Sequence, residues 1–229
     1  KQRPALLDEM QPLRFGLKPM GVYVNPTERC NLNCTYCYIP ESMRRDGQHM
    51  APDSLHAALD KLRGWFRNMH PKGFRPMVVF HGAEPLLNKD AVFPAIAAFA
   101  KDFRFGVQTN GTLLDNDAIA FLTKHDAGIG LSLDGAGKAV ADRTRVTWGG
   151  DGVHGQVVDA IRRLRATGYA SWSVICTATS LNQRNLTSMV EFLHREEVPT
   201  CMLNPVRCTR PGARTIKPKD KDLAKHFLA

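Results

Sequence analysis

Six short apolar segments alternate with amphipathic stretches along this chain of 229 residues, and this alternation limits the possible folds more than any other feature. The segments are typical of buried β-strands, because they are rich in apolar residues and end in polar or glycine-containing sequence. They comprise residues 22–24, 77–80, 105–108, 129–133, 172–176 and 201–206. Strands that are separated by helices form right-handed βαβ units. The sequence therefore predicts an α/β fold with a parallel sheet around one core.

The stretches between these segments place apolar residues at helical spacing, and three residues mark helix ends. Pro52 is expected in the first turn of a helix that continues to about residue 69. Asp115 is expected to cap the helix that reaches Lys124. Gly168 is expected to follow the last turn of the helix around residues 157–164. Further helices are predicted around residues 92–100 and 186–193.

Polar residues follow the predicted strands from the second to the sixth. They lie at positions 81–85, 108–111, 132–135, 177–179 and 204–205. A barrel enzyme builds its reactive site from the carboxyl ends of several strands, whereas an open doubly wound sheet concentrates its site at one switch point. Because so many strand ends are polar, the sequence predicts a partial (β/α)6 barrel that is similar to a TIM barrel.

Three of the six cysteines lie within eight residues, directly after the first predicted strand. These are Cys30, Cys34 and Cys37, and thiolates so close together on one loop can converge on a metal centre. A zinc site usually needs four ligands and paired cysteine or histidine knuckles. No second pair is present, although His49 is available as a fourth ligand. On a four-iron cube, three thiolates leave one iron without a protein ligand, and that iron can bind a small molecule.

The other three cysteines are dispersed. Cys176 and Cys201 fall within predicted strands, so we expect them to be buried thiols that pack as small apolar residues. Cys208 follows the sixth predicted strand at the expected mouth of the barrel, and it is a candidate for the substrate side. The first residues lack the continuous apolar stretch of a secretory signal. A tight cysteine cluster then indicates a metal site in a reducing compartment, and we expect the cytoplasm.

The spacing of the three clustered cysteines, with the aromatic Tyr36 before the third, resembles the CxxxCxΦC signature of the radical S-adenosylmethionine (SAM) superfamily. The resemblance extends over residues 22–205. Residues 82–85 (GAEP) are similar to the GGEP motif of that family, with Ala83 in place of the second glycine. Three further segments are similar to motifs of the peptide-modifying and sulfatase-maturing branch, whose members usually carry SPASM or twitch extensions. These segments are 108–111 (QTNG), 132–135 (SLDG) and 142–146 (DRTRV).

This resemblance implies a [4Fe-4S] cluster on the three cysteines, with SAM bound at the open iron. An electron from the cluster would cleave SAM, and the resulting 5′-deoxyadenosyl radical would abstract hydrogen from the substrate. The resemblance assigns SAM contacts to Tyr36, Gly82, Ala83, Glu84, Gln108, Asn110, Ser132 and Arg145. In this set, Glu84 would hold the methionine ammonium together with the backbone of residues 82–83, Ser132 and Arg145 would bind the ribose and the carboxylate, and the Tyr36 backbone would meet the adenine. Thr109, Asp134 and Cys208 are the candidates for the substrate side.

Each of these assignments has a structural alternative. Glu84 is also suited to the positive end of a following helix. Asn110 with Gly111 is a common turn sequence, Asp134 is suited to capping a loop, and Arg145 is suited to the protein surface. Ala83 preserves its backbone contacts if its φ is negative, whereas a positive φ is costly for a residue with a side chain.

The resemblance favours a maturase that acts on a residue of a ribosomally made peptide. An anaerobic sulfatase maturase that forms formylglycine is the alternative enzyme, and a cluster-binding scaffold without turnover is the alternative of another class. Members of this branch usually continue into an extension whose further cysteines bind auxiliary clusters. No cysteine follows Cys208 and the sequence lacks an initiator Met, so we expect a piece of a longer protein. Residues 1–20 would be an N-terminal extension, 21–206 the core barrel, and 207–229 the start of a C-terminal region.

The chain has a formal net charge of +9 and a pI of about 9.5, which favours acidic partners. The basic residues are scattered, and aromatic residues do not interleave with them as they do in a groove for single-stranded nucleic acid. We therefore expect a peptide or protein substrate, an acidic electron donor such as flavodoxin, and no nucleic-acid partner. No apolar run reaches the length of about 18 residues that a transmembrane helix needs, so no membrane association is expected.

Overall fold

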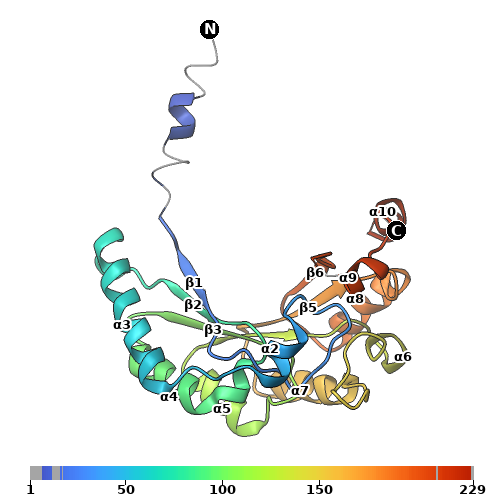
Figure 1. Ribbon diagram of the computed structural model, residues 1–229, viewed down its shortest axis with the longest axis horizontal. Helices are drawn as coiled ribbons and strands as arrows, with labels where there is room; N and C mark the ends of the chain where they lie inside the picture. Colours follow the sequence, from blue (N-terminus) through green and yellow to red (C-terminus); the bar gives the residue numbers. More distant parts are fainter. Residues whose placement is uncertain (1–6, 12–15, 17, 210, 228–229) are drawn as a thin grey trace.

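A curved sheet of six parallel strands forms the centre of the molecule (Figure 1). The computed structural model describes residues 7–11, 16, 18–209 and 211–227. The strands are β1 (Gly21–Val24), β2 (Met77–Phe80), β3 (Arg104–Thr109), β4 (Gly128–Ser132), β5 (Trp172–Ala178) and β6 (Cys201–Pro205). Their order in the sheet follows their order in the sequence, and every neighbouring pair is parallel. In the described part of the chain β1 and β6 do not pair with each other, so the sheet is an open, partial barrel, and that prediction is confirmed.

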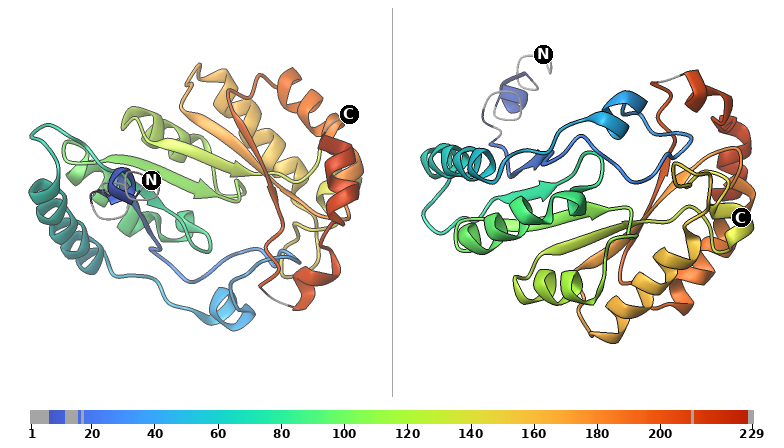
Figure 2. Two further views of the ribbon diagram at one scale, coloured as in Figure 1. Left: turned by 90° about the horizontal axis from the view of Figure 1, so that it is seen from above. Right: turned by 60° about the horizontal axis from the view of Figure 1, so that its bottom comes forward.

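Helices connect the strands and cover the convex face of the sheet (Figures 1 and 2). The α-helices are α2 (Glu41–Asp46), α3 (Pro52–Met69), α4 (Lys89–Phe99), α5 (Asn116–Lys124), α6 (Lys138–Ala141), α7 (His154–Ala166), α8 (Leu186–Arg195), α9 (Pro211–Thr215) and α10 (Asp220–Phe227), and η1 (Pro85–Asn88) and η2 (Gln183–Asn185) are 3-10 helices. No helix among the described residues has the length and apolar character that a membrane span requires. Parts of the predicted N-terminal extension (1–6, 12–15 and 17) and of the C-terminal region (210, 228–229) lie outside the described residues, and the domain boundaries stay predictions.

The three predicted helix ends are confirmed. Pro52 is the first residue of α3. Asp115 caps α5, because its Oδ1 accepts a hydrogen bond from the Ala118 N–H at 2.7 Å. Gly168 follows α7 and has a φ of +70°, a left-handed conformation that glycine adopts without a steric penalty.

The two faces of the sheet differ in burial. Along β4, Ile129 and Leu131 are buried against the helices, whereas Gly130 and Ser132 on the inner face are half-buried. β5 alternates in the same way over its seven residues. Side chains of successive residues point to opposite faces of a strand, so one face forms the core and the other lines the concave inner side of the barrel. The core is thus concentrated between the sheet and its helices.

The expectation for the two strand cysteines is confirmed for Cys176 and wrong for Cys201. Cys176 is buried in β5 with 1% of its surface exposed. Cys201 is exposed, because it lies in the edge strand β6. In this strand Leu203 is half-buried and the other four residues are exposed. Sequence pattern identified the strand, but burial at an edge depends on what packs against it.

Candidate cofactor site

The loop between β1 and α2 carries Cys30, Cys34 and Cys37 over the carboxyl ends of the strands. Backbone hydrogen bonds join this loop to a distant segment. The Asn33 N–H donates to the Val146 carbonyl at 2.8 Å, and the Thr35 N–H donates to the Thr144 carbonyl at 3.0 Å. The position of the cysteines is therefore set by residues 144–146, which follow β4 and α6.

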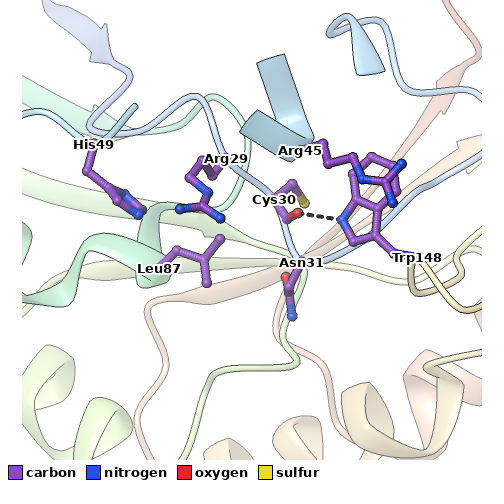
Figure 3. A pocket seen from close by; sticks show the side chains of 7 residues that line it. All are labelled: Arg29, Cys30, Asn31, Arg45, His49, Leu87 and Trp148. Atoms are coloured by element: carbon purple, nitrogen blue, oxygen red, sulfur yellow. Dashed lines mark hydrogen bonds between the residues drawn. The ribbon is translucent and has the colours of Figure 1, made fainter. Parts of the chain in front are cut away.

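The three cysteines are half-buried, and their donor set fits an iron–sulfur cluster better than a single metal ion. Among the described residues, no three His, Cys, Asp or Glu side chains come together around one ion. A cube binds each thiolate at a different iron, so its ligands do not need to meet at one point, whereas a zinc ion requires this. His49 lies at the far end of a pocket beside Cys30, so the structure does not support it as a fourth ligand (Figure 3).

Burial favours the protonated form of the Cys30 and Cys34 thiols while no metal replaces their protons. Burial raises the pKa of Cys30 to about 12, and the Leu32 N–H, which donates to the sulfur, opposes this rise. Burial also raises the pKa of Cys34, against the opposing charge of Arg145. Metal binding requires thiolates, so loading of the site releases protons.

Glu84 is completely buried at the end of β2 and connects this strand end to β3. Its Oε1 accepts hydrogen bonds from the Thr109 hydroxyl at 2.7 Å and from the Leu86 N–H at 3.1 Å. Its Oε2 accepts one hydrogen bond, from the Asn110 N–H at 2.7 Å. Burial raises the pKa of Glu84, and the donors from Asn110 and Thr109 oppose the rise. Glu84 therefore caps the start of the 3-10 helix η1, which agrees with the structural alternative to SAM binding. One acceptor position on Oε2 remains for a ligand.

The glycine-rich turn before Glu84 tolerates its alanine. Gly82 has a φ of +106°, and a Cβ there would lie 2.9 Å from Asn25 Cγ, so this position requires glycine. Ala83 has no such constraint, because Asp126 and Glu197 are the only described residues with a side chain and a positive φ. The backbone contacts expected of Ala83 are therefore sterically available.

Tyr36, Asp134 and Arg145 form one buried hydrogen-bond network. The Tyr36 hydroxyl donates to Asp134 Oδ2 at 2.7 Å and accepts from Arg145 Nη1 at 2.6 Å. Thr144 and Thr177 supply two further donors to the Asp134 carboxylate. Arg145 is 6% exposed, so it is not a surface cation, and its Nε is buried without a hydrogen-bond partner in the described structure.

The remaining predicted site residues lie on the inner side of the strand ends. Asn110 Nδ2 donates to Asn31 Oδ1 at 2.8 Å and lies 3.9 Å from the Cys30 sulfur. Gln108 Nε2 lies 3.5 Å from Ser132 Oγ, and its amide fills the space that a side chain at Gly130 would need. Asn110 thus makes a turn and also contacts the cysteine loop. Asp134 is paired by its own chain, and Cys208 is half-buried beyond β6, so their substrate-side roles stay predictions.

A pocket of about 430 Å³ opens beside Cys30 (Figure 3). It is lined by Arg29, Cys30, Asn31, Arg45, His49, Leu87 and Trp148. The Trp148 indole N–H donates to the Cys30 carbonyl at 2.9 Å. Sequence reasoning missed Asn31, which occupies a variable position of the cysteine motif, and it missed Arg44 and Trp148, which lie outside every motif.

Comparisons with known proteins agree with this geometry. The model of the family described as "Radical SAM superfamily" matches residues 24–193. An uncharacterized protein of Archaeoglobus fulgidus is 39% identical over 220 residues, which are 96% of this chain and 49% of that protein. The Fe-coproporphyrin III synthase of Methanosarcina barkeri is 28% identical over 80% of this chain and 42% of its own length. The serine-type anaerobic sulfatase-maturating enzyme of Bacteroides thetaiotaomicron is 28% identical over 75% of this chain and 41% of its own length. The chain thus spans half or less of the length of these relatives.

Solved structures share the fold. The structure of native anSMEcpe with bound AdoMet and Cp18Cys peptide has a TM-score of 0.77 at 21% identity, over 92% of this chain and 58% of that chain. Streptococcus suis SuiB bound to the precursor peptide SuiA has a TM-score of 0.74 at 13% identity, over 99% of this chain and 49% of that chain. At such low identity the likeness concerns the fold alone.

Proposed function

The chain belongs to the radical SAM superfamily, and from this premise we propose that it is the core of an enzyme that cleaves SAM reductively and abstracts hydrogen from a peptide or protein residue. One observation carries the proposal. The loop that carries the three thiols is joined by hydrogen bonds to Asn110 at the end of β3 and to Thr144 and Val146, which flank Arg145 in the segment after α6, and a cluster and SAM would lie together there. A scaffold without turnover would not need these buried polar groups around the cysteines.

The residues of the chain divide the work of binding. Cys30, Cys34 and Cys37 would hold the [4Fe-4S] cluster and leave one iron for SAM. When bound, the cluster and SAM would supply the one-electron and radical chemistry that removes hydrogen from the substrate. The free acceptor position of Glu84 suits the methionine ammonium, and the unpartnered Arg145 Nε suits its carboxylate, both as charge-assisted contacts.

A peptide or protein substrate is supported by the relatives and by the open inner face. Several relatives are sulfatase-maturating enzymes, and structures of the same fold hold peptides. The inner face of β1 presents Tyr23, which is 73% exposed and therefore available for contact with a peptide. The Fe-coproporphyrin III synthase relative supports a tetrapyrrole as the competing substrate class.

An acidic electron donor such as flavodoxin is also part of the proposal. The net charge is +9, and the exposed Arg29, Arg45 and His49 surround the pocket beside Cys30. Opposite charge steers protein encounters and raises association rates. A cluster that must be reduced by a protein donor and kept in a reducing environment agrees with a cytoplasmic location. Nucleic acid is not expected as a partner.

The test uses the chain of 229 residues, reconstituted anaerobically with iron and sulfide. With dithionite and SAM, it should form 5′-deoxyadenosine, measured by mass spectrometry, and no product from a four-iron protein would refute the proposed activity. Deuterium transfer to 5′-deoxyadenosine then separates the substrates. Transfer from a deuterated, ribosomally made precursor peptide is the expected result, and transfer from a deuterated serine or cysteine peptide of a sulfatase active site would identify the alternative, a sulfatase maturase. Transfer from deuterated Fe-coproporphyrin III alone would replace the peptide proposal.

A further inference from the structure

Arg44, in the short helix α2, contacts the cysteine loop at three points. Its Nε donates to the Ile39 carbonyl at 3.1 Å, and its Nη1 donates to the Leu32 carbonyl at 3.2 Å. Its own carbonyl accepts a hydrogen bond from the Cys30 N–H at 2.8 Å. The contacts at positions 32 and 39 lie on either side of Cys34 and Cys37, so one side chain ties both ends of this segment together.

Trp148 completes this arrangement from the other side of the loop. The Arg44 guanidinium lies 5.2 Å from the centre of the Trp148 ring, within the range of a cation–π interaction. The indole N–H of Trp148 donates to the Cys30 carbonyl at 2.9 Å. The guanidinium is therefore held in place by two carbonyls and one aromatic ring, and Arg44 as a residue is 3% exposed.

The charge of the buried Arg44 differs in its surroundings from that of Arg145. In the described part of the chain no acidic side chain forms an ion pair with Arg44, whereas Arg145 has Asp134 at 3.9 Å. A buried charge without a counter-charge is costly, and proteins usually pair it. The contacts of Arg44 with Cys30 and Leu32 place this charge beside the loop that carries the thiols.

We propose that Arg44 is a positioning residue that closes the cysteine loop and supplies the positive charge that a bound cluster balances. This inference rests on the proposed function, because a cube with three thiolates is the anion that would complete the site. Reduction adds one more negative charge to the cluster, and net charge and hydrogen bonding set the reduction potential of such clusters. A nearby fixed cation stabilises the reduced form more than the oxidised form, so Arg44 should raise the potential.

Three variants separate the charge from the hydrogen bonds. Arg44→Gln keeps N–H donors but loses the positive charge. Arg44→Lys keeps the charge but loses the planar guanidinium that can donate to two carbonyls at once. Arg45→Gln is the matched control, because Arg45 lies 5.5 Å from the same Trp148 ring and is exposed. Removal of the Arg44 charge beside the cluster should weaken the affinity of the cluster for an electron on the order of tenfold. This corresponds to a shift of the midpoint potential of about 59 mV for a one-electron couple.

The measurement is a redox titration of the reconstituted cluster, followed by electron paramagnetic resonance, with iron content and melting temperature of each variant. The expected result is a more negative midpoint for Arg44→Gln, and midpoints close to wild type for Arg44→Lys and Arg45→Gln. Equal midpoints for wild type and Arg44→Gln would overturn the electrostatic role. If Arg44→Gln does not hold iron, the midpoint of Arg44→Lys decides. Because this variant keeps the charge, a midpoint more negative than wild type by about 59 mV would also overturn the electrostatic role. A wild-type cluster with a measurable midpoint but no SAM cleavage would refute the proposed function alone.

Discussion

The cysteine loop and the edge strands β1 and β6 face the same open barrel, yet they are built differently. The loop is tied to distant segments by backbone pairs at Asn33 and Thr35, and its polar neighbours are buried. On the edge strands, Tyr23 is 73% exposed and Met202 is 54% exposed. Residues with many fixed partners tolerate few substitutions, whereas exposed side chains usually change stability by less than about 0.5 kcal/mol. Under the proposed function, cofactor binding would depend on the buried region, and substrate preference would be open to variation at the exposed edges.

The strongest test of this contrast compares two cysteines. Cys34→Ala should abolish SAM cleavage, because loss of one thiolate disrupts the cluster site. Cys201→Ala is the control, since this exposed thiol of the edge strand has no predicted role. Iron content and 5′-deoxyadenosine formation should fall to background in the first variant and stay near wild type in the second. Full activity of Cys34→Ala would falsify the assignment of the cluster.

A second test concerns the stability of the buried network. Asp134→Asn removes the charge that accepts hydrogen bonds from Tyr36 and Thr144 and faces Arg145. Loss of a buried charged partner should lower the free energy of unfolding by roughly 2–4 kcal/mol. Chemical denaturation of the cluster-free protein measures this change. Tyr23→Phe on the exposed edge should change stability by less than about 0.5 kcal/mol, and equal effects of the two substitutions would remove the contrast.

Glu84→Gln should weaken SAM binding more than it changes iron content. The substitution replaces a charge-assisted contact to the ammonium with a neutral one, at a cost of about 1–2 kcal/mol, or roughly tenfold in affinity. Calorimetry with the reconstituted protein gives the affinity. His81→Gln, at a half-buried neighbour, is the control. Unchanged SAM affinity in Glu84→Gln would leave Glu84 with its structural role at the start of η1 alone.

The smallest expected effect is on reductant docking. The Debye length falls from about 10 Å at 0.1 M salt to about 3 Å at 1 M, so added salt should slow flavodoxin-driven SAM cleavage several-fold. Dithionite-driven cleavage should change little. Charge reversal at Arg29 and Arg45 should reproduce the effect of salt, whereas reversal at the exposed Lys61 and Lys101 should not. Equal salt dependence with both reductants would argue against docking by charge.

Much of the fold could be predicted because it depends on local chemistry. Apolar strand segments, Pro52, Asp115 and Gly168 act through their neighbours in sequence, and the structure confirms each of them. The exposure of Cys201 could not be predicted, because it depends on the absence of a covering layer at the edge of the sheet. The positions of Arg44 and Trp148 could not be predicted either. Both lie outside the sequence motifs, and their contacts join segments that are far apart in the sequence.

By itself the sequence determined the three-cysteine loop, the polar strand ends and the alternation that produces a parallel half-barrel, because these follow from spacing and periodicity. Tertiary structure alone decided which of these polar groups meet. Tyr36 and Asp134 are 98 residues apart and share a hydrogen bond, and Tyr36 and Arg145 are 109 residues apart and share another. Such pairs form when successive βαβ units bring the carboxyl ends of the strands to one edge, and that geometry belongs to the folded chain rather than to any local segment.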